Sequence, residues 1–120
     1  VAIFAKQLQA NVRPTIFGDG TKTRDYVYVA DIAQANLLSL RRGDHLTVNL
    51  GLGKEITDQQ VYDTISSHWS KPPTVRYKVV RSGEVRRSCL QAKLARTKLG
   101  WKSKFTFAQG VSAYLATFNT

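Results

Sequence analysis

The chain has 120 residues, enough for one domain with its own hydrophobic core. Its 42% hydrophobic and 22% charged residues exclude a disordered or fibrous protein, and no apolar run is long enough to span a membrane. The 18 Lys and Arg residues outnumber the 8 Asp and Glu residues, and the net charge of +10 favours anionic partners, although the cations are scattered and a solvated basic surface accounts for most of them.

The first half of the chain predicts helices over residues 1–8 and 31–40 and strands over residues 15–17, 26–29 and 47–50. Asp31 is a natural N-cap for the second helix, because its side chain can accept a hydrogen bond from a free backbone amide. Glycines in the Gly18-Asp19-Gly20-Thr21 stretch predict a tight turn after the first strand.

The second half predicts helices over residues 58–69, 91–99 and 107–118 and a strand over residues 75–80. Thr57 and Thr106 each stand three residues before a glutamine, which is the pattern of a capping box. Gly100 is suited to end the helix before it in a left-handed conformation. The sequence therefore predicts an α/β fold, a small mixed domain of short strands and about five helices.

Few side chains are suited to making or breaking bonds. His45 and His68 lack partners at metal-ligand spacing, so we expect no metal site. Cys89 has basic neighbours that would favour its thiolate, but no base lies near it in sequence, and we interpret it as a buried structural cysteine. The Gly51-Leu52-Gly53 stretch lacks the other residues of a dinucleotide or phosphate loop and favours a plain turn. No residue is predicted to be catalytic.

Anion binding is the chemistry that remains. Arg24 follows a turn, and Arg81 begins an Arg-Ser-Gly-Glu stretch in which the glycine can bring Glu84 close to it. Guanidinium groups match pairs of phosphate oxygens, and a carboxylate can accept hydrogen bonds from adjacent sugar hydroxyls. The alternative is that Arg24 pairs with Asp25 or Asp19, and Arg81 with Glu84, in surface salt bridges.

Three stretches resemble one enzyme family. IFGDGTKTRDYVYVADIAQANLLSL resembles the IFGDGxxTRDYVYVxDVAxANLLAL segment of NAD-dependent nucleotide-sugar epimerases and dehydratases, which belong to the extended short-chain dehydrogenases/reductases. VNLGLGKEIT and RSGEVRRSCLQAKLARTKLGW are similar to later segments of the same enzymes, in the same order. Within the family the likeness points to the UDP-glucose 4-epimerases.

The resemblance implies that residues 1–120 form the C-terminal substrate domain, whose partner is a UDP-sugar. The family positions that contact this substrate match Arg24, Arg81, Glu84, Ile16, Phe17 and Asn49. In the family, the two arginines contact the diphosphate, the glutamate holds ribose hydroxyls, and backbone around the isoleucine and phenylalanine lies near the uracil. The asparagine lies close to the cleft, although Asn49 could equally cap the end of a strand.

The resemblance also implies what this chain lacks. Family enzymes bind NAD through a glycine-rich turn of a Rossmann domain and use a Tyr-x-x-x-Lys pair for catalysis, and none of the five tyrosines here is followed by lysine at that spacing. We therefore expect that this chain binds no cofactor and has no turnover alone, with the NAD-binding domain missing or on a separate chain. The first residue, Val1, is no translation start, which fits an excerpted or trimmed chain.

Two other functions stay open. A substrate domain without its partner exposes apolar surface, so the chain could be a self-associating module, and we expect a homo-oligomer. Nucleic-acid binding would suit the net charge of +10, but most aromatic residues stand at helix-core spacing and not between lysines. We expect a cytoplasmic location and no membrane partner.

Overall fold

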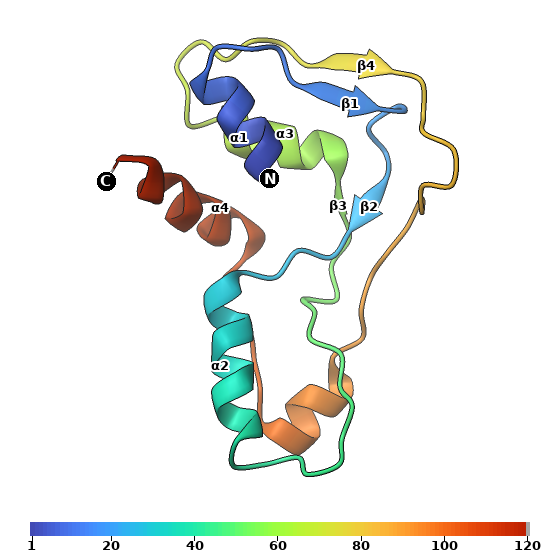
Figure 1. The fold of residues 1–120 in the computed structure, drawn as a ribbon, viewed down its shortest axis with the longest axis vertical. Coiled ribbons are helices and arrows are strands. Elements are labelled where there is room, and N and C mark those ends of the chain that lie inside the picture. Colours follow the sequence, from blue (N-terminus) through green and yellow to red (C-terminus); the bar gives the residue numbers. More distant parts are fainter. Residues whose placement is uncertain (120) are drawn as a thin grey trace.

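Ten short elements follow one another in the computed structural model, which describes residues 1–119 (Figure 1). They are α1 (Ala2–Gln9), β1 (Thr15–Phe17), β2 (Thr23–Arg24), α2 (Val29–Ser39), β3 (Ile56–Thr57), α3 (Asp58–Ser66), β4 (Arg76–Lys78), the π-helix η1 (Ala95–Leu99), α4 (Phe107–Ala116) and the 3₁₀-helix η2 (Thr117–Asn119). The predicted α/β fold, a small mixed domain of short strands and about five helices, is confirmed.

Two small sheets bring distant parts of the chain together. β1 pairs in parallel with β4, with Thr15 opposite Arg76, and β2 pairs antiparallel with β3. The backbone of Thr23 in β2 also bonds to the later loop: its amide donates to the Arg86 carbonyl at 2.9 Å, and its carbonyl accepts from the Ser88 amide at 3.2 Å. These bonds hold the loop after β4 against β2.

Two hydrophobic clusters stabilise the chain. The first lies between α1, α3 and α4, and its buried residues are Ala5, Leu8, Ile16, Val61, Tyr62, Ile65, Val111 and Leu115. The second lies between α2 and η1, and its buried residues are Ala35, Ala92, Ala95, Leu99 and Trp101. The Trp101 indole donates a 2.8 Å hydrogen bond to the Asp31 carbonyl, which satisfies its buried N–H group.

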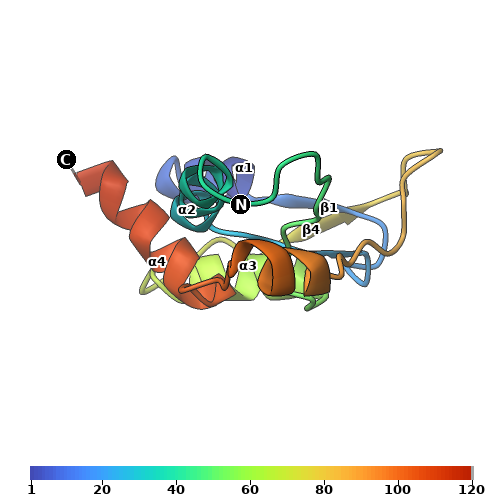
Figure 2. The ribbon, with the colours of Figure 1, turned by 90° about the horizontal axis from the view of Figure 1, so that it is seen from below.

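The molecule is a flat slab (Figure 2). It measures 47 × 38 × 16 Å, and its radius of gyration of 16.4 Å exceeds the value of about 14 Å typical of a globular chain of this length. A slab this thin cannot cover all its apolar side chains: Val29, Leu37 and Leu40 on or beside α2 are 70%, 67% and 80% exposed. The exposed apolar side chains leave surface for another molecule or domain to cover.

The helix termini follow local chemistry as predicted. The Thr57 hydroxyl accepts from the Gln60 amide while the Gln60 side chain accepts from the Thr57 amide, and the same reciprocal bonds start α4 at Thr106. Gly100 ends η1 in a left-handed conformation with φ of 70°. The helix predicted over 91–99 is confirmed over residues 93–99, where residues 93–94 are α-helical and residues 95–99 wind as a π-helix.

The prediction for residues 26–31 is wrong. β2 lies earlier, at Thr23–Arg24, and residues 26–28 form no strand because the Tyr26 and Tyr28 rings pack against Phe107 and Phe105 at centroid distances of 5.2 and 4.6 Å. α2 begins two residues before the predicted N-cap, with Tyr28 at the N-cap position.

Asp31 does not cap α2, because its carboxylate binds a different segment. The carboxylate is buried and accepts from the amides of Lys104 and Phe105 at 2.8 and 3.2 Å, which fixes the approach to α4. The strand predicted over residues 47–50 is also absent from the described structure. Val48 and Leu50 alternate with polar residues in the sequence because both pack on the second hydrophobic cluster.

Candidate functional site

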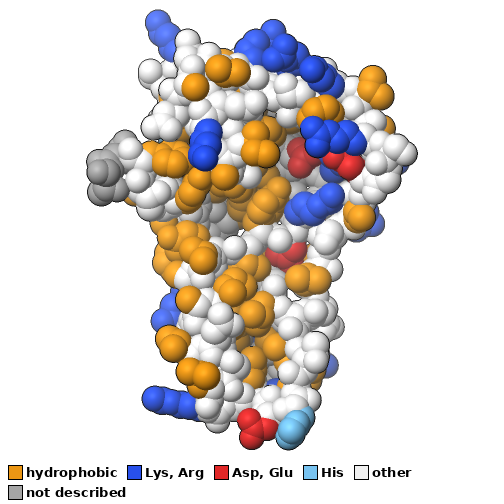
Figure 3. Space-filling view, in the orientation of Figure 1, with side chains coloured by type: hydrophobic (Ala, Val, Ile, Leu, Met, Phe, Trp, Pro, Cys, Tyr) orange, Lys and Arg blue, Asp and Glu red, His pale blue; other side chains and the backbone are white. Residues whose placement is uncertain are grey.

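A cavity of about 450 Å³ opens beside β1, between the start of α1 and the loop after β4. It is lined by Val1, Ile3, Phe4, Gln7, Thr15, Ile16, Phe17, Lys22, Tyr26, Asp58, Val61, Lys78 and Arg81. Figure 3 shows positive and negative side chains gathered over the region of β1 and β2 on the face that it draws. Three of the six predicted substrate-binding residues, Ile16, Phe17 and Arg81, therefore line one cavity.

Arg81 is anchored on an aromatic ring. Its guanidinium carbon lies 3.7 Å from the centroid of the Phe17 ring, in the geometry of a cation–π contact. Phe17 belongs to β1, so strand pairing fixes the ring and the ring fixes the guanidinium group. The Arg81 side chain is otherwise exposed, which leaves its N–H groups able to bind an anion.

Glu84 lies within reach of several cations. Its carboxylate accepts a hydrogen bond from the Lys22 ammonium group, and this bond is the main reason why the pKa of Glu84 lies below its ordinary value. Desolvation is the next largest effect and opposes it, while the positive charges of Lys22, Arg81 and Arg24 each lower that pKa by a smaller amount. Glu84 is therefore ionised at neutral pH and can act as a hydrogen-bond acceptor.

Arg24 contributes to the same electrostatic neighbourhood from β2. One guanidinium nitrogen donates to the Thr23 carbonyl at 2.7 Å. Burial raises the pKa of the Tyr26 phenol, the charge of Asp58 raises it further, and the charge of Arg24 acts in the opposite direction. The Arg24 charge thus acts on both Glu84 and Tyr26, although Arg24 is not among the residues that line the cavity.

The acids offered as alternative partners of the arginines are engaged elsewhere. Asp19 accepts from the amide and the hydroxyl of Thr21 at 3.0 and 2.6 Å. Glu84 pairs with Lys22, and the third acid, Asp25, binds three backbone amides. The arrangement does not support the simple surface pairs.

Asp25 explains why the glycine turn is no phosphate loop. Its carboxylate accepts from the amides of Leu52, Gly53 and Leu90 at 2.9, 2.9 and 3.2 Å, so an internal anion already occupies the turn. A Cβ atom on Gly51 would approach the carboxylate to 2.7 Å, which is why a glycine is required there. The turn predicted from the sequence is thus a structural clamp.

Ile16 and Asn49 differ from the charged residues. The Ile16 side chain is 1% exposed and belongs to the first hydrophobic cluster, so only its backbone can face a ligand. Asn49 is exposed in an irregular segment and does not line the cavity. Cys89 is exposed and not buried as predicted, with its sulfur 4.0 Å from an Asp25 carboxylate oxygen.

Sequence reasoning missed Lys22 and Asp58. The Lys22 ammonium group lies 3.5 Å from an Asp58 carboxylate oxygen and binds Glu84 as well, so it joins α3 to the loop after β4. Lys22 occupies one of the unspecified positions of the family segment, and its partner Glu84 is 62 residues away. Only the sequence position of Lys22, between a glycine turn and a strand, could have drawn attention to it.

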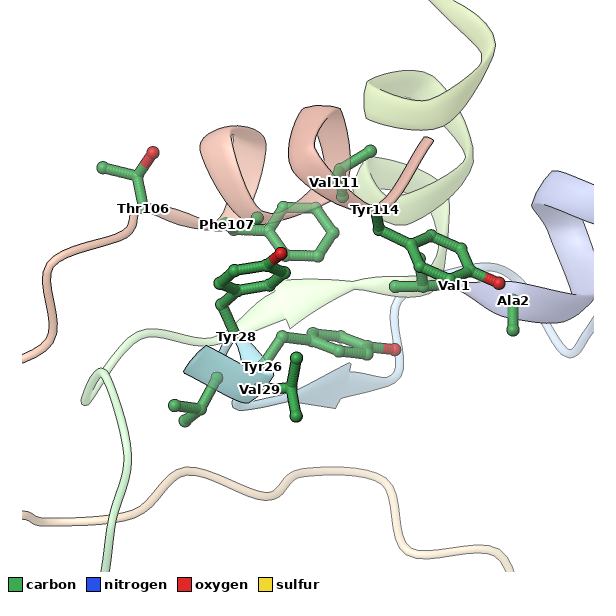
Figure 4. Close-up of a pocket in the computed structure, with 11 residues that line it drawn as sticks. Val1, Ala2, Tyr26, Tyr28, Val29, Thr106, Phe107, Val111 and Tyr114 are labelled. Atoms are coloured by element: carbon green, nitrogen blue, oxygen red, sulfur yellow. The ribbon is translucent and has the colours of Figure 1, made fainter. Parts of the chain in front are cut away.

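A second cavity of about 230 Å³ is apolar (Figure 4). Figure 4 shows the rings of Tyr26, Tyr28 and Phe107 facing one another, with Val1 and Tyr114 on the far side. We call this the apolar cleft; its lining also includes Ala2, Val27, Val29, Thr106, Gly110 and Val111. The apolar cleft lies at the start of α1 and faces the surface, where apolar side chains gain by being covered.

Within residues 1–119, no group of three or more His, Cys, Asp and Glu side chains is placed to hold a metal ion. In that same stretch, no helix has the length and apolar character needed to cross a membrane.

Comparisons with known proteins identify the family of this chain. A family model described as GDP-mannose 4,6 dehydratase matches residues 1–114. The chain is 39% identical over 111 residues to a putative UDP-glucose 4-epimerase of Methanocaldococcus jannaschii, covering 92% of this chain and 36% of that protein. It is 34% identical to the UDP-glucose 4-epimerase of Mycolicibacterium smegmatis, with 98% of this chain and 38% of that protein covered.

Solved structures show the same relationship. UDP-glucose 4-epimerase of Thermotoga maritima, solved with UDP-glucose, superposes with a TM-score of 0.90 at 37% identity. The match covers 98% of this chain and 38% of the Thermotoga maritima chain. The Thermus thermophilus UDP-glucose 4-epimerase, solved with NAD, gives a TM-score of 0.86 at 30% identity, with 98% and 39% covered. The chain thus spans little more than a third of the length of these relatives. It belongs to the GDP-mannose 4,6-dehydratase family of NAD-dependent nucleotide-sugar epimerases and dehydratases.

Proposed function

We propose that this chain is the UDP-sugar-binding part of an enzyme like UDP-glucose 4-epimerase. The observation that carries the proposal is the placement of Arg81 on the Phe17 ring in the lining of a cavity, with the charges of Arg24 and Arg81 both acting on the Glu84 carboxylate. Two guanidinium groups suit a diphosphate, and an ionised carboxylate suits the hydroxyl pair of a ribose. The family membership supplies the substrate class.

The arrangement supports binding at a distance from the reacting sugar carbon. Arg24 and Arg81 would hold the diphosphate, and contacts with this remote group would keep the sugar in place while its C4 centre is oxidised, turned and reduced from the other face. NAD supplies the hydride chemistry in such an enzyme. The glycine turn of this chain does not fit the NAD diphosphate, since the amides of Leu52 and Gly53 are bonded to Asp25.

The flat shape supports a further part of the proposal, namely that a separate NAD-binding domain covers the apolar cleft. Val29 lines the apolar cleft and is 70% exposed, and a domain packed there would bury it. We therefore expect the 120-residue chain to bind a UDP-sugar weakly and to show no turnover until that domain is supplied.

Calorimetric titration of the chain with UDP tests the proposal. The unaltered chain should bind UDP, and an Arg24→Ala/Arg81→Ala double variant should lose at least about a hundredfold in affinity, because two charge-assisted contacts are removed. An Arg41→Ala/Arg96→Ala variant removes the same charge from exposed positions away from the cavity and should bind as the unaltered chain does. No binding, or equal losses in both double variants, would show that the assigned site is wrong.

Self-association is a second candidate function, which the exposed apolar cleft favours. In the absence of another domain, a second copy of the chain can cover the same apolar side chains. Light scattering over a concentration series should then show dimers or larger species, and Val29→Glu should shift them toward monomer. Val79→Glu alters a valine that is 87% exposed outside the apolar cleft and should have no such effect. A monomer at every concentration would contradict this candidate.

A further inference from the structure

The geometry points to Lys22 as a positioning residue of the nucleotide site, whose ammonium group holds the Glu84 carboxylate where a ribose can reach it. This inference rests on the proposed function, because it assigns Glu84 to the ribose. It adds a residue that the family segment leaves unspecified and that the charge pattern of the sequence does not single out.

Lys22 is held between two acids. Its ammonium group binds Oε2 of Glu84 and lies 3.5 Å from Oδ2 of Asp58, and its side chain is only 12% exposed. A lysine this well buried has lost much of the freedom of its long stem, and the two carboxylates compensate for the loss of hydration of its charge. The ammonium group therefore has a defined place in the structure.

The backbone of Lys22 is fixed as well. Its carbonyl accepts from the amide of Asp58, the first residue of α3, at 3.0 Å. The next residue, Thr23, bonds through its backbone to Arg86 and Ser88 in the loop after β4. Lys22 thus lies directly before β2, between the start of α3 and the loop that carries Glu84.

The loop that carries Glu84 needs such support. Val79, Val80 and Val85 are 87%, 53% and 59% exposed, so the loop makes little apolar contact with the body of the protein. Gly83, next to Glu84, has a φ of 77° and open space around it. A carboxylate on a loop of this kind needs a contact with the rigid part of the molecule to be held in one place, and Lys22 supplies it.

The charges favour positioning over direct binding of phosphate. One ammonium group faces two carboxylates, so its positive charge is already neutralised before a diphosphate arrives. The hydrogen bond uses Oε2 of Glu84, which leaves Oε1 on the other side of the carboxylate for a ribose hydroxyl. If Lys22 acts through Glu84, removal of the Lys22 ammonium group must weaken the binding of uridine and of UDP by the same factor, since both ligands carry the ribose.

The test compares UDP and uridine by NMR titration of the 120-residue chain. Lys22→Met keeps most of the apolar stem of the side chain. It should lower the affinity for both ligands about tenfold, which is the effect of losing one charge-assisted contact. Lys22→Arg should restore most of the affinity. In a Glu84→Gln background, Lys22→Met should cause no further loss, because the group that it positions is already altered.

A matched control is Lys98→Met, which removes an exposed lysine outside the cavity and should leave uridine affinity within about twofold of the unaltered chain. A loss for UDP alone in Lys22→Met would mean that the ammonium group binds phosphate, and would overturn the positioning role. So would additive losses in the Lys22→Met/Glu84→Gln variant.

A second readout does not depend on nucleotide binding. Titration of ¹³C-carboxyl-labelled glutamate should show that the pKa of Glu84 is lower than ordinary in the unaltered chain and rises in Lys22→Met, since the hydrogen-bond donor is lost. An unchanged pKa would overturn the assignment of Lys22. Failure of the unaltered chain to bind UDP together with a raised pKa in Lys22→Met would instead contradict the proposed function and leave the Lys22–Glu84 contact established.

Discussion

The Arg81 guanidinium group lies over the Phe17 ring, with 3.7 Å between the guanidinium carbon and the ring centroid. This contact joins an exposed loop to β1 and directs a cation toward the cavity that β1 borders. Aromatic support of this kind orders an arginine without using its N–H groups, which stay available for an anion.

Replacing the ring tests that support. Phe17→Leu keeps an apolar side chain in β1 and removes the aromatic face, so UDP affinity should fall about threefold, as expected for loss of a cation–π contact at an exposed site. Phe118→Leu is the control, because Phe118 packs on Tyr114 and does not line the cavity. Equal UDP dissociation constants for the unaltered chain and Phe17→Leu would mean that the ring does not position Arg81.

The Asp25 clamp should matter for stability. Asp25→Asn removes the charge that accepts from the amides of Leu52, Gly53 and Leu90, and the free energy of unfolding should fall by about 2 kcal/mol. Urea unfolding measures this change. Asp19→Asn makes the same substitution in an exposed local turn and should cost less than about 0.5 kcal/mol. Similar costs for both variants would contradict the clamp.

The capping boxes give a second stability prediction. Thr57→Ala and Thr106→Ala each remove a hydroxyl that accepts from a helix amide, and each should lower the free energy of unfolding by about 1 kcal/mol. Thr47→Ala alters an exposed threonine in an irregular segment and serves as the control. Restoration of stability by serine at positions 57 and 106 would attribute the loss to the cap.

Lowering the pH should weaken the contacts that Glu55 makes with Arg87 and Thr23. Hydrogen bonds from Arg87 and Thr23 hold the pKa of Glu55 below its ordinary value. Because the folded pKa is the lower one, the stabilisation is complete above the ordinary glutamate pKa of about 4.3 and is lost as pH falls through the folded value. Stability measured from pH 7 downward should therefore fall in this acid range.

Arg87→Gln tests the origin of that fall. It should reduce stability at pH 7, and the difference from the unaltered chain should disappear at the acid end, where Glu55 is protonated. The Arg87 side chain is 78% exposed, so added salt should also shrink the difference. Arg96→Gln changes the net charge equally without breaking an ion pair in the described residues. A difference that persists in acid would exclude Glu55 as the cause.

The sequence predicted those features that depend on near neighbours. The two capping boxes and the left-handed Gly100 are set by residues within four positions of one another, and all three are confirmed. The strands predicted over 26–29 and 47–50 failed because alternating apolar residues can serve packing as well as strand pairing. Tyr26 and Tyr28 serve contacts with residues about 80 positions away, as shown by their ring partners Phe107 and Phe105.

In the candidate site, too, the sequence predicted some residues and missed others. Arg24, Arg81 and Glu84 were named from their neighbours and from the family resemblance, and the charges of both arginines lower the pKa of Glu84. Lys22 was not named, because its role depends on a contact across 62 residues that no local pattern records. The clamp formed by Asp25 was missed for the same physical reason.

A structure of the 120-residue chain with UDP bound tests the central claim most directly. The account predicts the diphosphate between the guanidinium groups of Arg24 and Arg81, the uracil along the β1 backbone and the ribose on Glu84. Nucleotide bound in the apolar cleft between Val1 and Tyr114, or at a site without either arginine, would contradict it.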